Sequence, residues 1–164
     1  MTQPTVARLD VPFHGGTVHL TVFGAEQAAS PLPGGPGGPG LPHDYLTPLT
    51  ALATERPVVL YDLIGTGRST RLQLPWSRAL LAEELHVIRS HLGSAPIDLY
   101  LHSAAIRGAD DLWRHPHRCR RVITSIFCAS TARTLSLSDE MRRSPGFCTR
   151  PHGNRESPMR QTST

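Results

Sequence analysis

The 164-residue sequence contains no lysine, few aromatic residues and no long apolar run. All seventeen basic residues are arginine, so the Gly-Lys-Ser or Gly-Lys-Thr ending of a Walker phosphate-binding loop is excluded. Aromatic residues make up 5% of the chain and do not alternate with the arginines, as a stacking platform for single-stranded nucleic acid requires. No stretch of eighteen apolar residues is present, so we expect no contact with a membrane.

Cysteine is also scarce, because Cys119, Cys128 and Cys148 form an odd set without the spacing of a disulfide framework. His115, His117 and Cys119 lie within five residues, yet a zinc site needs a second pair of ligands. The N-terminus lacks the basic region and apolar core of a signal peptide. We therefore expect a cytoplasmic protein that uses no metal and no cofactor.

The arginines become denser after Arg107, and the formal net charge is +4. A basic tail can bind polyanions through phosphate contacts. The other interpretation is a solvated surface, which we favour, so no nucleic-acid partner is expected. A non-catalytic binding module that uses the Arg-rich end remains the alternative function.

The hydrophobic pattern divides the chain into a structured part and a polar end. We expect one domain over residues 1–135, followed by a short helix and a disordered basic tail over 136–164. Alternating apolar residues predict strands at 5–11 and 16–24, joined by a hairpin turn at His14-Gly15-Gly16. Continuous apolar runs predict buried strands at 57–62, 97–103 and 121–127, and helical patterns lie at 43–55, 76–93 and 104–116.

Strands that alternate with helices predict an α/β fold with a mixed, mostly parallel sheet, an N-terminal antiparallel hairpin and flanking helices. In the 43–55 helix we expect Asp44 to cap the start, with Tyr45, Leu49 and Leu52 on one buried face.

The 76–93 helix has an apolar stripe, and its polar side carries acidic residues. Leu81, Leu85 and Ile88 fall at helical spacing and predict the buried face. We expect Glu83 and Glu84 to be solvated on the opposite side.

Ser103 ends a predicted strand and begins a predicted helix, where a nucleophile elbow places its serine on a strained turn. Such a turn needs small residues two positions before and after the serine. Ala105 is small enough, but Leu101 is bulky. From this pattern alone, Ser103 is either a nucleophile or the cap of the next helix.

The glycine-rich stretch LPGGPGGPG at 32–40 allows three interpretations. A linker is disfavoured because predicted structure resumes on both sides. A dinucleotide-binding loop is disfavoured because the prolines remove N–H donors. The remaining interpretation is a loop over 31–42 that lends a backbone N–H to an oxyanion beside a serine elbow.

Two stretches resemble proline iminopeptidase-like α/β-hydrolases. Residues 33–37, Pro-Gly-Gly-Pro-Gly, are similar to the HGGPG loop of that family, with Pro33 in place of its histidine. Asp62, Gly65, Gly67 and Arg68, followed by Ser69, are similar to its Asp-led turn after a strand that ends in Tyr-Asp. The resemblance covers about residues 5–135 and extends to the G-x-S-x-G elbow, where Leu101 and Ala105 replace both glycines.

The resemblance implies a serine hydrolase that releases N-terminal residues from a small peptide, amide or ester through an acyl-enzyme. It implies Ser103 as nucleophile, the N–H groups of Gly35 and Ala104 as oxyanion hole, and Asp62, Gly65 and Gly67 as a structural turn.

The same resemblance implies that parts of the machinery are missing. Family members are about twice as long and add a cap, then the acid and histidine of the triad. The matching positions do not exist in this sequence, and His152 lacks the expected surroundings. We therefore expect an incomplete α/β-hydrolase core that is inactive or nearly so alone, and that self-associates through an open sheet edge. Charges on the helix after Ser103 (Arg107, Asp110 and Asp111) would also be costly to bury.

Overall fold

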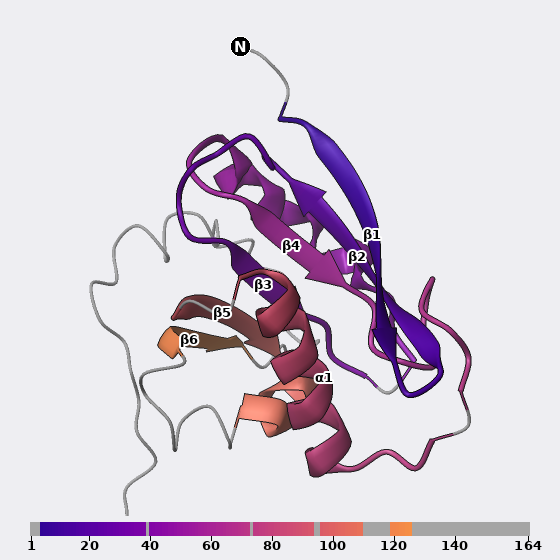
Figure 1. Ribbon diagram of the computed structural model, residues 1–164. Helices are drawn as coiled ribbons and strands as arrows, with labels where there is room; N and C mark the ends of the chain where they lie inside the picture. The colour runs from indigo at the N-terminus through magenta and orange to yellow at the C-terminus, as the bar shows by residue number, and fades with distance from the viewer. Residues whose placement is uncertain (1–3, 39, 73, 94–95, 110–118, 126–164) are drawn as a thin grey trace, which may run out of the picture.

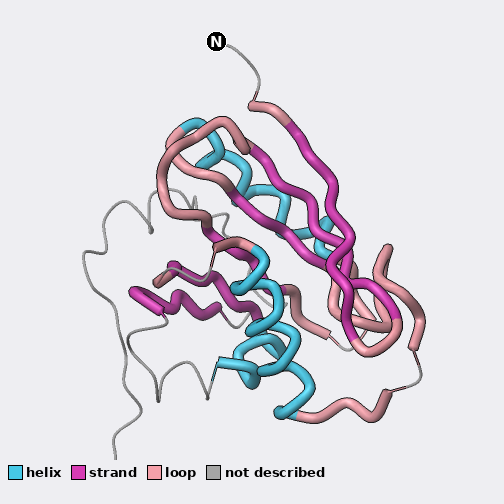
Figure 2. Tube along the Cα trace, viewed as in Figure 1, coloured by secondary structure: helices cyan, strands magenta, loops and turns pink. Residues whose placement is uncertain are grey.

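The computed structural model describes residues 4–38, 40–72, 74–93, 96–109 and 119–125. Six strands and three helices are present in these ranges (Figures 1 and 2). None of the described helices is long and apolar enough to cross a membrane. In chain order the elements are β1 (Val6–Phe13), β2 (Gly16–Phe23), β3 (Leu32–Gly35), the 3₁₀ helix η1 (His43–Thr54), β4 (Val58–Tyr61), α1 (Arg78–His91), β5 (Ile97–His102), the 3₁₀ helix η2 (Ser103–Ala109) and β6 (Cys119–Ser125).

The six strands form one mixed sheet in the order β1-β2-β4-β3-β5-β6. β1, β2 and β4 pair antiparallel, whereas β4, β3, β5 and β6 run parallel. The hairpin turn at His14 and Gly15 has positive φ at both residues (47° and 79°), as a two-residue hairpin loop requires. The expected sheet and its antiparallel front hairpin are confirmed.

Helices cover both faces of the sheet, as Figure 2 shows for α1 and η2 in front and η1 behind. β4 is buried on both faces: Val59 and Tyr61 pack with α1, and Val58 and Leu60 pack with η1. A strand covered on both sides has no polar face, which explains why the apolar run predicted β4 correctly.

The glycine-rich stretch is a strand where it was expected to be a loop. Leu32–Gly35 forms β3, all four residues are buried, and the strand lies between β4 and β5. A Cβ added to Gly34 would lie 2.8 Å from the Leu60 side chain, so the neighbouring strand occupies the space that a side chain would need. The glycines at the start of the stretch therefore serve close packing, and the irregular segment begins at Pro36.

The helix over 43–54 is 3₁₀, which changes its buried face. Leu46, Leu49 and Leu52 are buried at a spacing of three residues, the period of a 3₁₀ helix. Tyr45, expected on that face, is 40% exposed. The predicted cap at Asp44 was wrong, because Pro42 precedes the helix and the Asp44 carboxylate lies 3.1 Å from the Arg68 guanidinium.

α1 has the predicted apolar stripe, but the prediction for Glu84 was wrong. Its carboxyl group is buried (1% exposed) and its Oε1 accepts a 2.5 Å hydrogen bond from the Ile64 backbone N–H. The buried side of α1 includes Glu84 because the loop after β4 packs against it. Glu83 is exposed, as expected, and its carboxylate lies 2.9 Å from the ring of His14.

Several expectations fall outside the described residues. These are the predicted short helix and disordered tail over 136–164 and the cost of burying Asp110 and Asp111. The zinc ligands considered at His115 and His117, and the surroundings of His152 as a catalytic histidine, lie there too.

Candidate active site

Ser103 occupies a sharp turn between β5 and η2. Its φ of 49° lies in the left-handed region, and among the described residues only His14 is another non-glycine residue with positive φ. Ser77 shows what an ordinary helix cap looks like here: it is extended (φ −142°) and its hydroxyl accepts from the Leu80 N–H. The strained conformation of Ser103 is typical of a nucleophile elbow and differs from that of a cap.

The sharp turn at Ser103 forms although Leu101 stands where the elbow pattern expects a glycine. Leu101 is fully buried, and Gly35 of β3 lies in register with it. A Cβ on Gly35 would lie 2.9 Å from the Leu101 side chain and 2.9 Å from that of Ala105. The absence of a side chain on β3 thus accommodates the bulk on β5.

Tyr45 connects the glycine loop to the residue before Ser103. Its hydroxyl accepts a hydrogen bond from the Gly37 N–H and lies 2.7 Å from Nδ1 of His102. Because the Tyr45 oxygen accepts from Gly37, its own proton can be donated to His102. Burial lowers the pKa of His102, which agrees with a neutral ring whose Nδ1 is the acceptor.

Gly37 also approaches Ser103 directly. A Cβ there would lie 2.7 Å from Nδ1 of His102 and 2.9 Å from the Ser103 Cβ. Only glycine permits the loop to pass so close to the elbow. The loop and the serine, about 70 positions apart in the sequence, are therefore packed against each other.

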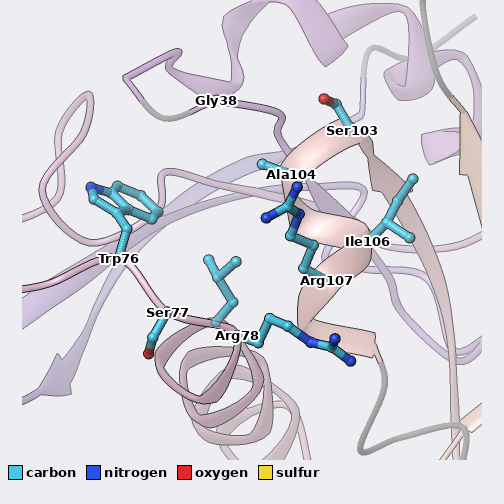
Figure 3. A pocket seen from close by; sticks show the side chains of 9 residues that line it. Gly38, Trp76, Ser77, Arg78, Ser103, Ala104, Ile106 and Arg107 are labelled. Carbon is cyan, nitrogen blue, oxygen red and sulfur yellow. The ribbon is translucent and has the colours of Figure 1, made fainter.

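A pocket of about 600 Å³ opens beside the elbow (Figure 3). Ser103 is exposed at its edge and Ala104 contributes to its wall, next to Gly38 of the loop. Gly35 does not line the pocket, because it lies inside β3 in register with Leu101. The structure thus brings Ser103 and Ala104 to one cavity, and Gly35 is not among the residues that line it.

The Asp-led turn surrounds a buried carboxylate. Asp62 Oδ1 accepts from the His43 backbone N–H (2.7 Å) and lies 2.8 Å from its Nδ1, while Oδ2 accepts from the Arg68 N–H (2.8 Å). Burial alone would raise the pKa of Asp62, but these hydrogen bonds outweigh it and hold that pKa below its usual value. Gly65 and Gly67 both have positive φ, and a Cβ on Gly67 would lie 2.3 Å from Asp62 Oδ2.

This turn supports the site without lining it. Asp62 fixes the start of η1 through His43, and η1 carries Tyr45 to the loop. Ser69 ties the turn to β2, because its hydroxyl accepts from the His19 N–H and donates to the Asp62 carbonyl. The residues of the turn therefore act on the elbow through η1.

Comparisons with known proteins agree on the kind of fold. No protein-family model matches the chain. A proline iminopeptidase from Lactiplantibacillus plantarum is 35% identical over 97 residues, which cover 54% of this chain and 33% of that protein. One from Heyndrickxia coagulans is 36% identical over 91 residues, covering 54% and 32%.

The crystal structure of proline iminopeptidase from Mycobacterium smegmatis superposes with a TM-score of 0.63 and 30% identity, over 71% of this chain and 42% of that one. The described residues have an α/β-hydrolase fold. The chain spans about a third of the length of the curated relatives it matches.

Within this α/β-hydrolase fold, sequence reasoning missed three residues at the site. Tyr45 was assigned to the core, and Trp76 and Arg78 were not singled out. Trp76 is 43% exposed and lines the pocket with Arg78 and Arg107. Arg107, whose charge would be costly to bury, is exposed. The available signal for the pocket was Trp76, because it lies directly before Ser77, the cap of α1.

Proposed function

We propose that the chain carries the nucleophile and oxyanion-binding part of a serine hydrolase of proline iminopeptidase type. Ser103 would attack the carbonyl carbon of an amide or ester, forming an acyl-enzyme and releasing the amine or alcohol. Water would then attack the acyl-enzyme and regenerate the hydroxyl. The N–H of Ala104 is the first oxyanion donor we assign, and Gly35 remains the predicted second.

The observation that carries this proposal is the positive φ of an exposed serine at the mouth of a pocket. Strained backbone conformations cluster at functional sites, and Ser103, unlike His14, is not part of a hairpin turn that requires positive φ. The packing of Gly37 against Ser103 supports it, because it holds the glycine loop at the elbow. The neighbouring Gly38 lies closer to the pocket than Gly35 does, so its N–H is the other candidate donor.

Ser103 has no base as a partner among the residues that the structure describes. Among the described residues, no imidazole is hydrogen-bonded to the Ser103 hydroxyl, and His102 directs its Nδ1 to Tyr45. A serine hydroxyl without a base is a weak nucleophile. We therefore expect the described residues alone to hydrolyse substrates slowly, and the addition of a cap, an acid and a histidine to raise the rate.

A chimera tests the proposal. Residues 4–125 would replace the matching part of the Lactiplantibacillus plantarum proline iminopeptidase, which then supplies the rest of the fold. We expect release of nitroaniline from proline 4-nitroanilide, and a loss of about a thousandfold or more in kcat/KM on Ser103→Ala. A folded chimera that is inactive, or one in which both versions turn over equally, would contradict the role of Ser103.

A further inference from the structure

The glycine loop beside Ser103 depends on the hydroxyl group of one side chain. Gly37 is buried, and its backbone N–H donates a hydrogen bond to the Tyr45 hydroxyl. A buried N–H that loses its acceptor costs more free energy than an ordinary hydrogen bond contributes. Removal of the Tyr45 hydroxyl should therefore release the loop from its place.

The same hydroxyl contacts the residue that precedes the serine. Its oxygen lies 2.7 Å from Nδ1 of His102, and the Tyr45 and His102 rings pack edge to face with centroids 5.2 Å apart. Because the Tyr45 oxygen accepts from Gly37, its own proton is available to the His102 nitrogen. One hydroxyl thus joins the loop to the end of β5, which leads into Ser103.

The helix that carries Tyr45 is anchored in the core. η1 begins at His43, whose backbone N–H and ring Nδ1 lie 2.7 and 2.8 Å from the Asp62 carboxylate. His43 and Asp62 are both buried, and Leu46 and Leu49 of the same helix pack in the core. The Tyr45 hydroxyl is therefore presented to the loop from a fixed element, as a residue that orients a site requires.

The loop has little freedom to move at this contact without changing the pocket. A Cβ on Gly37 would lie 2.9 Å from the Ser103 Cβ, so the backbone there is already packed against the turn. Gly38, the next residue, lines the pocket together with Ser103 and Ala104 (Figure 3). Because Gly37 and Gly38 are joined by one peptide bond, the acceptor of the Gly37 N–H also limits where the Gly38 N–H can lie.

We propose that Tyr45 is a positioning residue, whose hydroxyl holds Gly37 and Gly38 against the turn at Ser103, where the oxyanion would form. The inference rests on the proposed function, because the place of the loop affects catalysis only if Ser103 attacks a carbonyl. Burial raises the pKa of Tyr45, so the hydroxyl keeps its proton and stays uncharged. The contact is therefore compatible with a prolyl substrate that carries an ammonium group.

Tyr45→Phe in the full-length chain tests this inference without requiring hydrolysis. The substitution removes the hydroxyl and keeps the ring that packs on His102. In a ¹⁵N-labelled sample we expect the Gly37 amide to exchange with solvent about fivefold to tenfold faster, and the Gly38 and Ala104 amide resonances to shift. Tyr45 is 40% exposed, so the variant should fold, which the same spectrum checks.

The ring nitrogens of His102 give a second readout, which a purely structural role of Tyr45 would not change. Burial lowers the pKa of His102, so the ring is neutral at pH 8. If Tyr45 donates to Nδ1, the ring proton lies on Nε2. Loss of the donor in Tyr45→Phe should shift the Nδ1 resonance in long-range ¹H–¹⁵N spectra, in which His102→Gln identifies the signals.

Thr50→Val is the matched control on the same helix. The Thr50 hydroxyl donates a 2.8 Å hydrogen bond to the Thr47 carbonyl within η1. The substitution therefore also removes one hydroxyl and one hydrogen bond from η1, but it should leave Gly37 exchange and the His102 nitrogens unchanged. In the chimera, Tyr45→Phe should lower kcat about tenfold with little change in KM, because a displaced donor stabilises the transition state less.

The outcomes separate this inference from the proposed function. Unchanged Gly37 exchange and an unchanged His102 Nδ1 resonance in Tyr45→Phe, or equal changes in Thr50→Val, would overturn the role of Tyr45 whatever the chimera does. An active chimera whose kcat is unaffected by Tyr45→Phe would overturn it too, and would leave the proposed function intact. Faster Gly37 exchange together with an inactive folded chimera would retain Tyr45 as the residue that positions the loop and would overturn the role of Ser103.

Discussion

A carboxyl group inside the sheet-and-helix core gives this protein a pH-dependent stability. Glu84 is buried beneath α1, and its Oε2 atom has no hydrogen-bond partner among the described residues. Burial raises the pKa of Glu84 to about 8, although the Ile64 N–H opposes the shift. The folded protein therefore holds a proton on Glu84 at neutral pH, whereas the unfolded chain, with a pKa near 4.5, does not.

Replacing Glu84 with glutamine should remove this dependence. Between about pH 4.5 and 8 the folded state binds the extra proton, so the free energy of unfolding of the wild type falls as the pH rises. Glu84→Gln keeps an oxygen for the Ile64 N–H and cannot ionise. We expect it to be more stable than wild type by on the order of 4 kcal/mol at pH 8, with the difference becoming small toward pH 4.5.

Urea denaturation at a series of pH values measures this difference. Glu83→Gln is the control, because Glu83 is exposed and its substitution should leave the pH slope nearly unchanged. A Glu84→Gln difference that stays constant from pH 5 to 8 would show that the Glu84 carboxyl group titrates normally.

Among the elements, α1 depends on its first turn, and that turn also forms part of the pocket. The Ser77 hydroxyl accepts the Leu80 N–H at 3.1 Å. Ser77→Ala should lower the free energy of unfolding by about 1 kcal/mol through loss of this cap. Thermal denaturation checks it, with Ser90→Ala as the control at an exposed position inside the same helix. Equal effects of the two substitutions would mean that the cap contributes nothing.

Elements covered on both faces were the easiest to predict from sequence. β4 is a continuous apolar run, and β5 is mostly apolar apart from Asp98 and His102, because helices pack on either side of both strands. β3 was missed, because a strand made of Leu-Pro-Gly-Gly has none of the usual strand composition and forms only where neighbouring strands leave no room for side chains. Glu84 was wrongly predicted to be solvated for a related reason. Its burial depends on a tertiary contact with the loop at Ile64, and the spacing of apolar residues along a helix carries no information about such a contact.

The features of the candidate site also fall into two groups, those set by local sequence and those set by tertiary packing. The turns at Ser103 and Asp62 could be located from the sequence because each depends on local residues: a strand followed by a helix, and a carboxylate followed by glycines. The catalytic role of Ser103 stays a prediction. Tyr45 reaches His102 across 57 positions, and the pocket joins residues from α1 and η2. Contacts of that kind depend on tertiary packing, so no local pattern indicates them.

At the scale of the whole molecule, the described sheet ends at β1 and β6. In the part of the chain that the structure describes, β6 pairs only with β5. A strand edge with unpaired backbone groups favours association with another edge. We expect the purified chain to form dimers or larger species whose proportion rises with concentration, measured by size-exclusion chromatography with light scattering. A monomer at all concentrations, with a single sharp thermal transition, would contradict this expectation.

The pairing of Leu101 with Gly35 constrains how the elbow could be altered. Gly35 has no side chain, so the Leu101 side chain fits beside it, and a Cβ at position 35 would collide with Leu101 and Ala105. A larger residue on β3 would therefore disturb the turn that carries Ser103 without touching the serine itself. Leu101→Gly would have the opposite fault, because it would leave a void between β3 and β5.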